Sequence, residues 1–388
     1  MRRLLCAALL WLAALAAIAQ QPVTVGAVLP LSGNLSDLAA ELRKALLLWQ
    51  EEVNEAGGLL GRRVELRLLD AQSEASATGR LYEQLVREKA DLLIGPLGSA
   101  ASMGAAAVAE RSRRVLVNTT GTSRLAQRAG YRYTFQIPAP LASYASGAFD
   151  LARGLGIKRI VLLARDDPTS REIATRARDE ALKQGFAPGE VEIYAPDNDD
   201  FAAQARRAKA ADAEAWIAFG LPQDAAEMVK SFRKLRFAPR LFVAQGAAQP
   251  DFVKRVGQDA EYAIGILPYD RRTAVPANRR FAEAFAKRWS AEPTEVAAEG
   301  YAAGKVLEEA VRRAGSLEPE KLREALAALE LETPLGRYKV DRDGAQLGVQ
   351  PLLTQIQRGR RVVVWPEALA AAKPVLPYPA WDTRKPLK

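Results

Sequence analysis

The chain has 388 residues, of which 49% are hydrophobic and 26% charged, a composition that indicates two or three globular domains and excludes intrinsic disorder. It contains no histidine, so imidazole base catalysis and histidine-ligated metals are excluded. The formal net charge of +9 indicates either an arginine-rich solvated surface or attraction to an anionic ligand or membrane face.

Residues 1–19 have the three parts of a secretory signal peptide. Two arginines precede an apolar run from Leu4 to Ile18, which ends at a cleavage site of the Ala-x-Ala type. The run is shorter than a membrane-spanning helix requires, so we expect export and a soluble mature protein in the periplasm. Cleavage also removes Cys6, the single cysteine, and leaves the mature chain without a disulfide or a thiol nucleophile.

The first part of the mature chain alternates strand-like and helix-like stretches. Ser36 is predicted to cap a helix whose apolar face carries Leu38, Leu42, Leu46, Trp49 and Val53. Strands are predicted at 23–29, 64–68, 91–95 and 115–118, and further helices through 81–86 and over 100–112. Repeated βαβ units of this length predict a parallel sheet with helices on both faces.

The same alternation begins again after Pro138 and Pro140, which predicts a second α/β lobe. Its strands are predicted at 159–164, 190–195, 215–220 and 241–246, and its helices at 169–185, 200–213 and 222–235. Two later helices, one rich in aromatic residues around Phe285 and one over 294–315, have no new strands beside them. We therefore expect these two helices to return to the first lobe.

The C-terminal part predicts short antiparallel strands with turns at Asp343-Gly344 and Arg358-Gly359, followed by a proline-rich tail on the surface. The expected division of the chain is 20–138 plus 269–338 for lobe 1, and 139–268 plus 339–388 for lobe 2 with the tail. Hinge segments are expected near 137–140, 267–270 and 335–350.

Five segments in this order carry a resemblance to a known family: VGAVLPLSG, NEAGGLLGRRVELRLLD, LLIGPLGSAAS, VLVNTTGTSRLA and TPLGRYKVDRDG. The chain resembles the periplasmic type I solute-binding proteins of ABC importers, specifically the leucine/isoleucine/valine-binding family. The resemblance implies an α/β fold of two doubly wound parallel-sheet lobes joined by a three-stranded hinge, a Venus flytrap that closes on its ligand. It also implies an inner-membrane ABC permease with cytoplasmic ATPases as the partner. We expect a monomer, and no cofactor, metal or nucleic acid.

The resemblance assigns ligand contacts in lobe 1 to Ser99, Thr120 and Thr122, whose hydroxyl and backbone groups would meet the α-carboxylate and α-amino groups. Ser99 follows a strand and opens a helix, and a helix N-terminus offers free N–H groups to an anion. Two structural alternatives remain open. Ser99 is also a plausible helix cap, and the two threonines are also plausible loop residues that bond their own backbone.

The second lobe departs from the family pattern. Gln245 stands where the amino-acid binders have a glutamate that pairs with the ligand ammonium, Pro168-Thr169-Ser170 replaces a Tyr-Gly, and Leu38 occupies a position that is often aromatic. An ammonium buried without its counter-charge costs roughly 3 to 5 kcal/mol. Either another carboxylate, Asp167, Asp224 or Asp270, takes over the pairing, or the ligand has no ammonium. Leu221 would add an apolar wall.

Other protein classes find little support. Nucleotide-binding glycine signatures are missing from the sequence, so an enzyme is not expected. Transcriptional repressors share the lobe architecture, but they need a DNA-binding helix-turn-helix and a cytoplasmic location, whereas a signal peptide is predicted for this chain. The predicted function is capture of a branched-chain or other amino acid for import. The alternatives are binding of aromatic or other non-amino carboxylates, and a role as the ligand-sensing subunit of a receptor.

Overall fold

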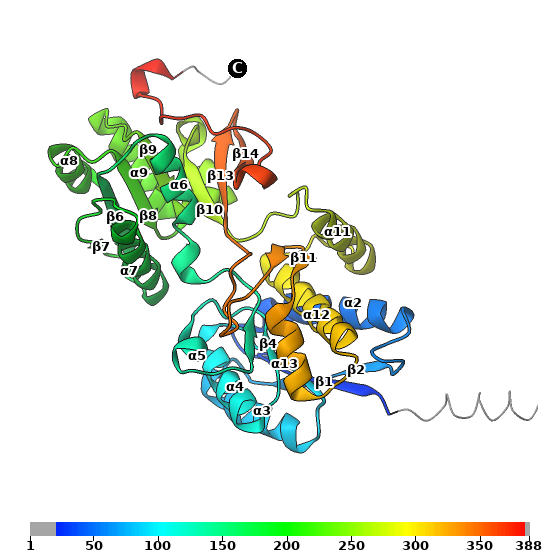
Figure 1. Cartoon of the computed structure of the whole chain (residues 1–388). Helices are drawn as coiled ribbons and strands as arrows, with labels where there is room; N and C mark the ends of the chain where they lie inside the picture. Colours follow the sequence, from blue (N-terminus) through cyan, green and yellow to red (C-terminus); the bar gives the residue numbers. More distant parts are fainter. Residues whose placement is uncertain (1–20, 385–388) are drawn as a thin grey trace, which may run out of the picture. The chain divides into compact units, whose positions relative to one another are not determined.

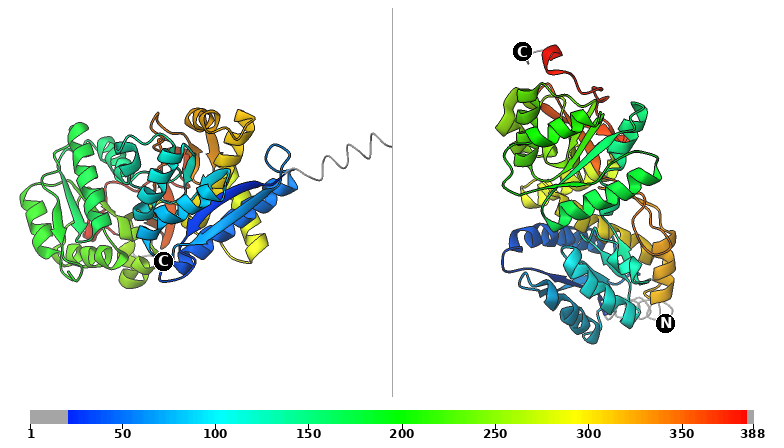
Figure 2. Two further views of the ribbon diagram at one scale, coloured as in Figure 1. Left: turned by 90° about the horizontal axis from the view of Figure 1, so that it is seen from below. Right: turned by 90° about the vertical axis from the view of Figure 1, so that its left-hand side faces the viewer.

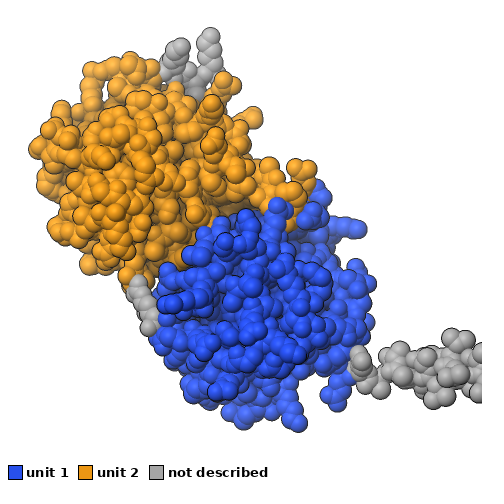
Figure 3. All heavy atoms as spheres, viewed as in Figure 1, with its two compact units in different colours: residues 1–138, 280–348 blue, residues 139–279, 349–388 orange. Residues whose placement is uncertain are grey.

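The computed structural model describes residues 21–384, so the predicted signal peptide at 1–19 lies outside the described residues. The chain forms two compact units, which Figure 3 shows in different colours. Unit 1 consists of the residues up to Pro138 together with Arg280–Gly348, and unit 2 of Ala139–Arg279 together with Val349–Lys388. The chain therefore passes from one unit to the other three times, and the predicted α/β fold of two parallel-sheet lobes is confirmed.

Two of the three crossings lie later in the chain than the expected boundaries at 268 and 338. Residues 269–279 stay with unit 2, where the carboxylate of Asp270 pairs with Arg361 (3.3 Å), and the hydroxyl of Tyr269 donates to Asn278 (2.8 Å) within the segment. Residues 339–348 stay with unit 1, where the amide of Gln346 donates to the carbonyl of Ile137 (3.0 Å). Such long-range side-chain contacts leave no periodic signal in a sequence.

Unit 1 is built on a five-stranded parallel sheet in the order β2-β1-β3-β4-β5. Figure 1 labels β1, β2 and β4 of this sheet. Its strands are β1 (Val23–Leu29), β2 (Val64–Asp70), β3 (Leu92–Ile94), β4 (Leu116–Asn118) and β5 (Thr134–Gln136). A short antiparallel hairpin, β11 (Leu331–Thr333) and β12 (Gly336–Tyr338), is separate from this sheet.

The helices of unit 1 are α2 (Ser36–Glu55), α3 (Thr78–Arg87), α4 (Ser99–Ser112), α5 (Leu125–Arg128), α12 (Glu295–Ala314) and α13 (Pro319–Ala328), with the 3-10 turn η1 (Ala75–Ala77). Helix α11 (Pro276–Trp289) spans the second crossing. Helix α2 buries Leu42, Leu46 and Trp49 as its periodicity predicts, but Leu38 is 47% exposed. The cap prediction for Ser36 is wrong, because the helix begins at Ser36 and the preceding residue makes no side-chain capping bond.

Helix α12 returns to unit 1 and packs closely on α2, as expected. A Cβ added to Gly300 would lie 2.4 Å from Leu42, and one added to Gly304 would lie 2.4 Å from Trp49. Residues later in α12 therefore meet residues later in α2, so the two helices run in the same direction. Because α2 starts just after β1 ends, the N-terminus of α12 lies toward the carboxyl edge of the sheet of unit 1.

Unit 2 is built on a seven-stranded mixed sheet in the order β14-β13-β10-β9-β8-β6-β7. Its strands are β6 (Ile160–Arg165), β7 (Glu192–Tyr194), β8 (Ala215–Phe219), β9 (Leu241–Ala244), β10 (Ile264–Leu267), β13 (Leu352–Gln357) and β14 (Arg360–Trp365). The first five strands are parallel, whereas β13 and β14 form an antiparallel hairpin at the edge. Its turn is at Arg358-Gly359, as predicted, and both residues have positive φ.

Helices cover both faces of the sheet in unit 2 (Figures 1 and 2). They are α6 (Ser146–Gly154), α7 (Pro168–Lys183), α8 (Ala202–Ala210), α9 (Pro222–Leu235) and α10 (Pro250–Val256), with 3-10 turns η2 (Leu141–Ser143), η3 (Gln245–Ala248), η4 (Gly257–Ala260), η5 (Glu367–Leu369) and η6 (Trp381–Thr383). Strand β8 shows why the sequence favours this arrangement, since Ile217 and Phe219 enter one core and Trp216 the other. A strand buried on both faces reads as a continuous apolar run.

Two buried carboxyl groups lie one turn apart on α12. Glu299 is 4% exposed and Glu295 is half-buried, and neither forms a hydrogen bond or ion pair with another residue in the described part of the chain. Burial raises the pKa of both carboxyl groups, and the charge of Glu295 raises the pKa of Glu299 further. The folded protein therefore holds protons that the unfolded chain releases at a lower pH.

We predict that this pair makes the protein less stable as the pH rises. Stability from a carboxyl group with a raised pKa is present below its ordinary pKa and is lost as pH passes through the folded-state value. Thermal melting should therefore occur at a lower temperature at about pH 8 than at about pH 5, and Glu299→Gln should reduce this difference. Each pKa unit by which the folded-state value exceeds the unfolded-state value lowers the free energy of unfolding at high pH by about 1.4 kcal/mol. The exposed Glu283→Gln is the control, and equal pH slopes for wild type and Glu299→Gln would contradict the prediction.

Candidate ligand-binding site

Unit 1 brings Ser99, Thr120 and Thr122 together at the carboxyl ends of the adjacent strands β3 and β4. The hydroxyl oxygen of Ser99 accepts hydrogen bonds from the N–H groups of Thr122 (3.2 Å) and Ser123 (3.3 Å), and it lies 3.4 Å from the hydroxyl of Thr122. The hydroxyl of Thr120 accepts from the N–H of Gly98 at 2.5 Å. The loop after β3 and the loop after β4 are therefore joined by their own polar groups.

These contacts differ from the two structural alternatives considered for the three residues, a helix cap at Ser99 and threonines bonded to their own backbone. Gly98, not Ser99, precedes the first turn of α4, and no side-chain cap is present. The hydroxyl of Thr120 bonds to Gly98 and to the carbonyl of Pro96 (3.3 Å), which belong to the neighbouring loop and not to its own backbone. Because the Ser99 oxygen already accepts two N–H groups, its O–H is left to donate, either to the Thr122 hydroxyl over a long 3.4 Å or, in its place, to an incoming anion.

The first turn of α4 adds backbone donors at the same place. The N–H of Ser102 donates to the carbonyl of Gly98 (3.1 Å), which leaves the N–H groups of residues 99–101 without an acceptor inside the helix. Free N–H groups and the helix dipole together favour a negatively charged group at a helix N-terminus. Unit 1 therefore presents hydroxyl and amide donors at the start of this helix.

A buried polar network holds the loop after β4 in place. The side-chain oxygen of Asn118 accepts from Ser102 (3.0 Å) and from the N–H of Gly121 (3.1 Å), and the amide of Gln136 donates to the carbonyl of Gly121 (2.8 Å). Gly121 has no room for a side chain, since an added Cβ would lie 2.3 Å from the hydroxyl of Ser102. Sequence reasoning missed these residues, although a polar side chain at the end of a buried strand was the available signal.

A mainly apolar pocket lies beside this half-site within unit 1. It is lined by residues that follow β1, β2 and β3, among them Pro30, Leu35, Ala71, Pro96, Leu97 and Ala101. Leu97 and Ala101 flank Ser99 in the sequence, so donors and an apolar surface meet around the start of α4.

Unit 2 places Asp167, Leu221 and Gln245 at a single edge of its sheet. They follow β6, β8 and β9, which are neighbours and parallel, so their carboxyl ends coincide. The loop that begins with Gln245 packs on Leu221, because a Cβ added to Gly246 would lie 2.2 Å from the Leu221 carbonyl oxygen. Leu221 is 46% exposed, and the half-buried amide of Gln245 makes no hydrogen bond to another described residue.

The carboxylate of Asp167 holds the N-terminus of α7. One oxygen accepts from the N–H of Ser170 (2.9 Å) and the other from the hydroxyl of Ser170 (2.7 Å). The substitution of Pro168-Thr169-Ser170 for the Tyr-Gly of related binders thus builds a capped helix start with proline in its first turn.

Asp224 and Asp270 are also engaged within unit 2. Asp224 is 2% exposed and accepts from Arg165 (2.8 Å) and from the N–H of Leu221 (2.8 Å), although burial still raises the pKa of its carboxyl group. Burial opposes ionisation of Asp270 too, but hydrogen bonds and charge from Arg272 and Arg361 hold the pKa of Asp270 below its ordinary value. Each of the three carboxylates considered as a replacement for the missing glutamate therefore already has protein partners.

Comparison with known proteins gives these half-sites a context. The family model described as periplasmic binding protein matches residues 22–360. The chain belongs to this family. The family consists of solute binders without enzymatic activity, so the prediction that the chain is not an enzyme is confirmed.

Individual relatives of this periplasmic binding protein are distant in sequence. The Leu/Ile/Val-binding protein homolog 8 of Brucella abortus is 23% identical over 90% of the chain and 92% of the relative. The ABC transporter substrate-binding protein of Desulfitobacterium hafniense in complex with Leu has a TM-score of 0.72 at 21% identity, covering 88% of this chain and 100% of that one. A solute-binding protein of R. palustris in complex with benzoate has a TM-score of 0.66 at 19% identity, covering 93% and 97%. At these identities the solved structures show the fold alone. Between residues 21 and 384 this binding protein has no helix that is both long and apolar enough to cross a membrane.

We predict that Gly121→Ala disturbs the loop after β4 of the binding protein. The added methyl group has no space beside Ser102 and Asn118, so we expect a loss of about 1–3 kcal/mol of stability in urea unfolding. Gly154→Ala is the control, because a Cβ at that helical glycine meets no atom within 4 Å. A Gly121→Ala protein as stable as wild type would show that the network does not fix this loop.

Proposed function

We propose that this periplasmic binding protein captures a small carboxylate-bearing solute in the periplasm and delivers it to an inner-membrane ABC permease with cytoplasmic ATPases. The observation that carries the proposal is the donor set at the start of α4. It combines the hydroxyl of Ser99, the nearby hydroxyl of Thr122 and the free N–H groups of the first helical turn. Hydrogen bonds from such donors recognise a carboxylate without a neighbouring cation.

We propose further that the solute shifts the population of the protein toward a closed form. Ser99, Thr120 and Thr122 would contact it from unit 1, and Gln245, Leu221 and Asp167 from unit 2. A ligand favours a closed form only to the extent that it binds that form better than the open one. Membership of the family and the three crossings of the chain support this mechanism. The protein would act as a monomer and need no cofactor.

Two solute classes fit the carboxylate half-site: branched-chain or other amino acids, and carboxylates without an amino group. The relatives bound to leucine and to benzoate illustrate the two classes. A specific observation favours the second class here. Asp167, Asp224 and Asp270 already accept hydrogen bonds from protein donors, whereas the amide of Gln245 is uncommitted. A neutral amide serves as donor and acceptor to a neutral polar group but supplies no counter-charge to an ammonium.

The deciding experiment is a thermal-shift screen of mature protein that has been unfolded and refolded to remove bound solute. At 100 times its dissociation constant a solute should stabilise the protein by about 2.7 kcal/mol. We expect shifts with aromatic or aliphatic carboxylates that lack an amino group. A shift with leucine-like amino acids alone would select the first class, and no shift with any carboxylate would overturn the proposal.

We predict that Ser99→Ala weakens solute binding without unfolding the protein. Loss of a hydrogen bond to a charged group costs about 1.5–3 kcal/mol, or roughly 10- to 100-fold in affinity. The matched control is Ser112→Ala, at the other end of α4, where the hydroxyl donates to backbone carbonyls of its own helix, those of Val108 (2.7 Å) and Ala109 (3.4 Å). Isothermal titration calorimetry measures both, and unchanged affinity in Ser99→Ala would remove the site assignment.

We also predict that Gln245→Glu changes the preferred solute class. The new carboxylate supplies the missing counter-charge, so leucine-like amino acids should bind more tightly and carboxylates without an amino group more weakly. Each change should be about tenfold or more, since a close charge interaction contributes more than about 1.4 kcal/mol when desolvated. The same calorimetric titrations compare the two proteins, and parallel changes for both solute classes would show that residue 245 does not face the solute amino group.

A further inference from the structure

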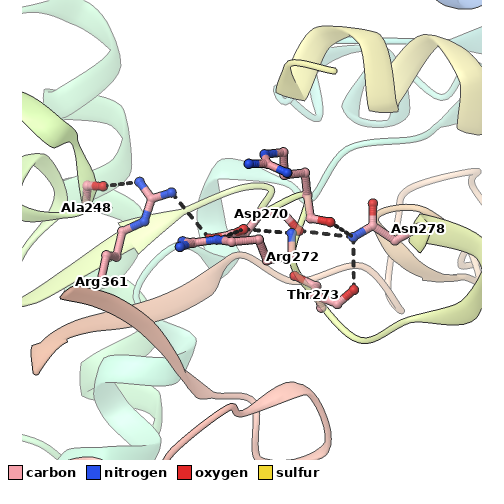
Figure 4. Close-up of polar contacts among 7 residues, drawn as sticks. Ala248, Asp270, Arg272, Thr273, Asn278 and Arg361 are labelled. Carbon is pink, nitrogen blue, oxygen red and sulfur yellow. Dashed lines mark hydrogen bonds and ion pairs between the residues drawn. The ribbon is translucent and has the colours of Figure 1, made fainter. Parts of the chain in front are cut away.

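Arg361 on β14 contacts two segments of unit 2 that both lie far from it in the sequence (Figure 4). One nitrogen of its guanidinium, Nη1, donates to the carbonyl oxygen of Ala248 at 2.5 Å. The other, Nη2, donates to the carboxylate of Asp270 at 3.3 Å. Ala248 ends the turn η3 that begins with Gln245, and Asp270 lies in the segment by which the chain leaves unit 2 after β10.

Asp270 does not need Arg361 as its charge partner. Arg272 binds the same carboxylate through Nε (3.0 Å) and Nη2 (2.7 Å), and its backbone N–H adds a third hydrogen bond (2.9 Å). The side chain of Asn278 then fixes the segment by donating to the carbonyls of Asp270, Arg271 and Thr273, each at 3.1 Å (Figure 4). This turn is complete without the second arginine.

The position is also an unfavourable one for an arginine. The side chain of Arg361 is only 26% exposed, and its Nε is buried without a hydrogen-bond partner in the described residues. Burial lowers the pKa of this guanidinium, and Arg272 adds a second positive charge next to the shared carboxylate. Apolar side chains often replace buried charges without loss of stability, and an unpaired buried donor calls for an explanation. Since Asp270 already has Arg272 as its partner, the short hydrogen bond to the Ala248 carbonyl is the contact that explains an arginine at this position.

The turn η3 is closely packed on the rest of unit 2. A Cβ on Gly246 would lie 2.2 Å from the Leu221 carbonyl oxygen, and one on Gly265 would lie 2.0 Å from the N atom of Ala248. The hydrogen bond from Arg361 to the Ala248 carbonyl therefore fixes the end of this short turn. Gln245, whose side-chain amide makes no hydrogen bond to another described residue, lies three residues earlier.

We infer that Arg361 is a positioning residue that holds the turn Gln245–Ala248 in place and ties it to the segment around Asp270. The effect of Arg361 on solute binding rests on the proposed function, because it requires Gln245 to contact the solute. The holding of the turn by Arg361 does not depend on that function. We therefore expect Arg361 to serve solute affinity and not stability.

The first test needs no solute. Hydrogen exchange of the amides at 245–249 should be about tenfold faster in Arg361→Met, because a charge-assisted hydrogen bond to the turn is lost. The melting temperature should be equal to or above that of wild type, because a buried charge has been removed. Arg361→Lys should restore part of the protection, since its ammonium can still donate to the Ala248 carbonyl. Unchanged exchange in Arg361→Met would overturn the inference even if the protein binds no carboxylate.

The second test is a double-mutant cycle with Gln245→Ala, titrated with benzoate and with L-leucine. If Arg361 acts through the turn, each single variant should weaken the bound probe about tenfold. The double variant should then lose less than the product of the two factors. Independent, multiplicative losses would overturn the coupling to Gln245. If wild type binds neither probe, the proposed solute class fails and the exchange test alone decides the role of Arg361.

Arg240→Met is the matched control. Arg240 also pairs with a carboxylate, Glu214 (2.9 Å), and donates to a backbone carbonyl, that of Leu155 (2.7 Å). It directly precedes β9, whereas Gln245 directly follows it, so the two residues lie at opposite edges of the sheet. Exchange at 245–249 and affinity for both probes should stay at wild-type values. A loss equal to that of Arg361→Met would show a general effect of removing an arginine from unit 2.

Discussion

The common direction of neighbouring parallel strands is the constraint on which both half-sites depend. Because β3 and β4 end at one edge, Gly98 meets Thr120 and Ser99 meets Thr122 although more than twenty residues separate each pair. The same constraint gathers the residues that follow β6, β8 and β9 at one edge of unit 2. Strand direction alone, however, fixes neither the path of a loop nor the groups it leaves free. Those depend on how each loop satisfies its own buried polar atoms.

Polar groups that already form hydrogen bonds within the protein maintain the fold, whereas polar groups without such bonds remain available to a solute. Asn118 and Gln136 use their amides on the backbone of Gly121, and Asp167 uses its carboxylate on the start of α7. By contrast, the O–H of Ser99, the first N–H groups of α4 and the amide of Gln245 keep unused capacity. All three are neutral, so the donor groups of unit 1 and the amide of unit 2 are suited to a solute that brings its own single charge.

The sequence predicted most strands and helices, though not β5 or β10, because continuous apolar runs and helical periodicity are local signals. The candidates Ser99, Thr120 and Gln245 came from the resemblance to a known family, which the predicted strand ends alone would not have supplied. The sequence could not show that Asp224 is occupied by Arg165, or that Ser99 accepts from the loop after β4, because those contacts join residues far apart in the chain. For the same reason it missed the unpaired glutamates of α12, whose burial depends on packing and not on residue type.

The choice between solute classes is a question of where negative charge is available. Arg165 already neutralises Asp224, and Arg272 and Arg361 together neutralise Asp270, so neither carboxylate has charge left for a solute ammonium unless an arginine moves away. For the buried pair of Asp224 and Arg165, loss of the arginine costs roughly 3 to 5 kcal/mol. Recruiting either carboxylate to a solute ammonium would therefore offset most of the gain from the new pair. A neutral solute group at Gln245 incurs no such cost. Gln245 in place of a glutamate removes one counter-charge for a solute ammonium, and the arginine partners of Asp224 and Asp270 remove two others. Both features of unit 2 favour carboxylates without an amino group.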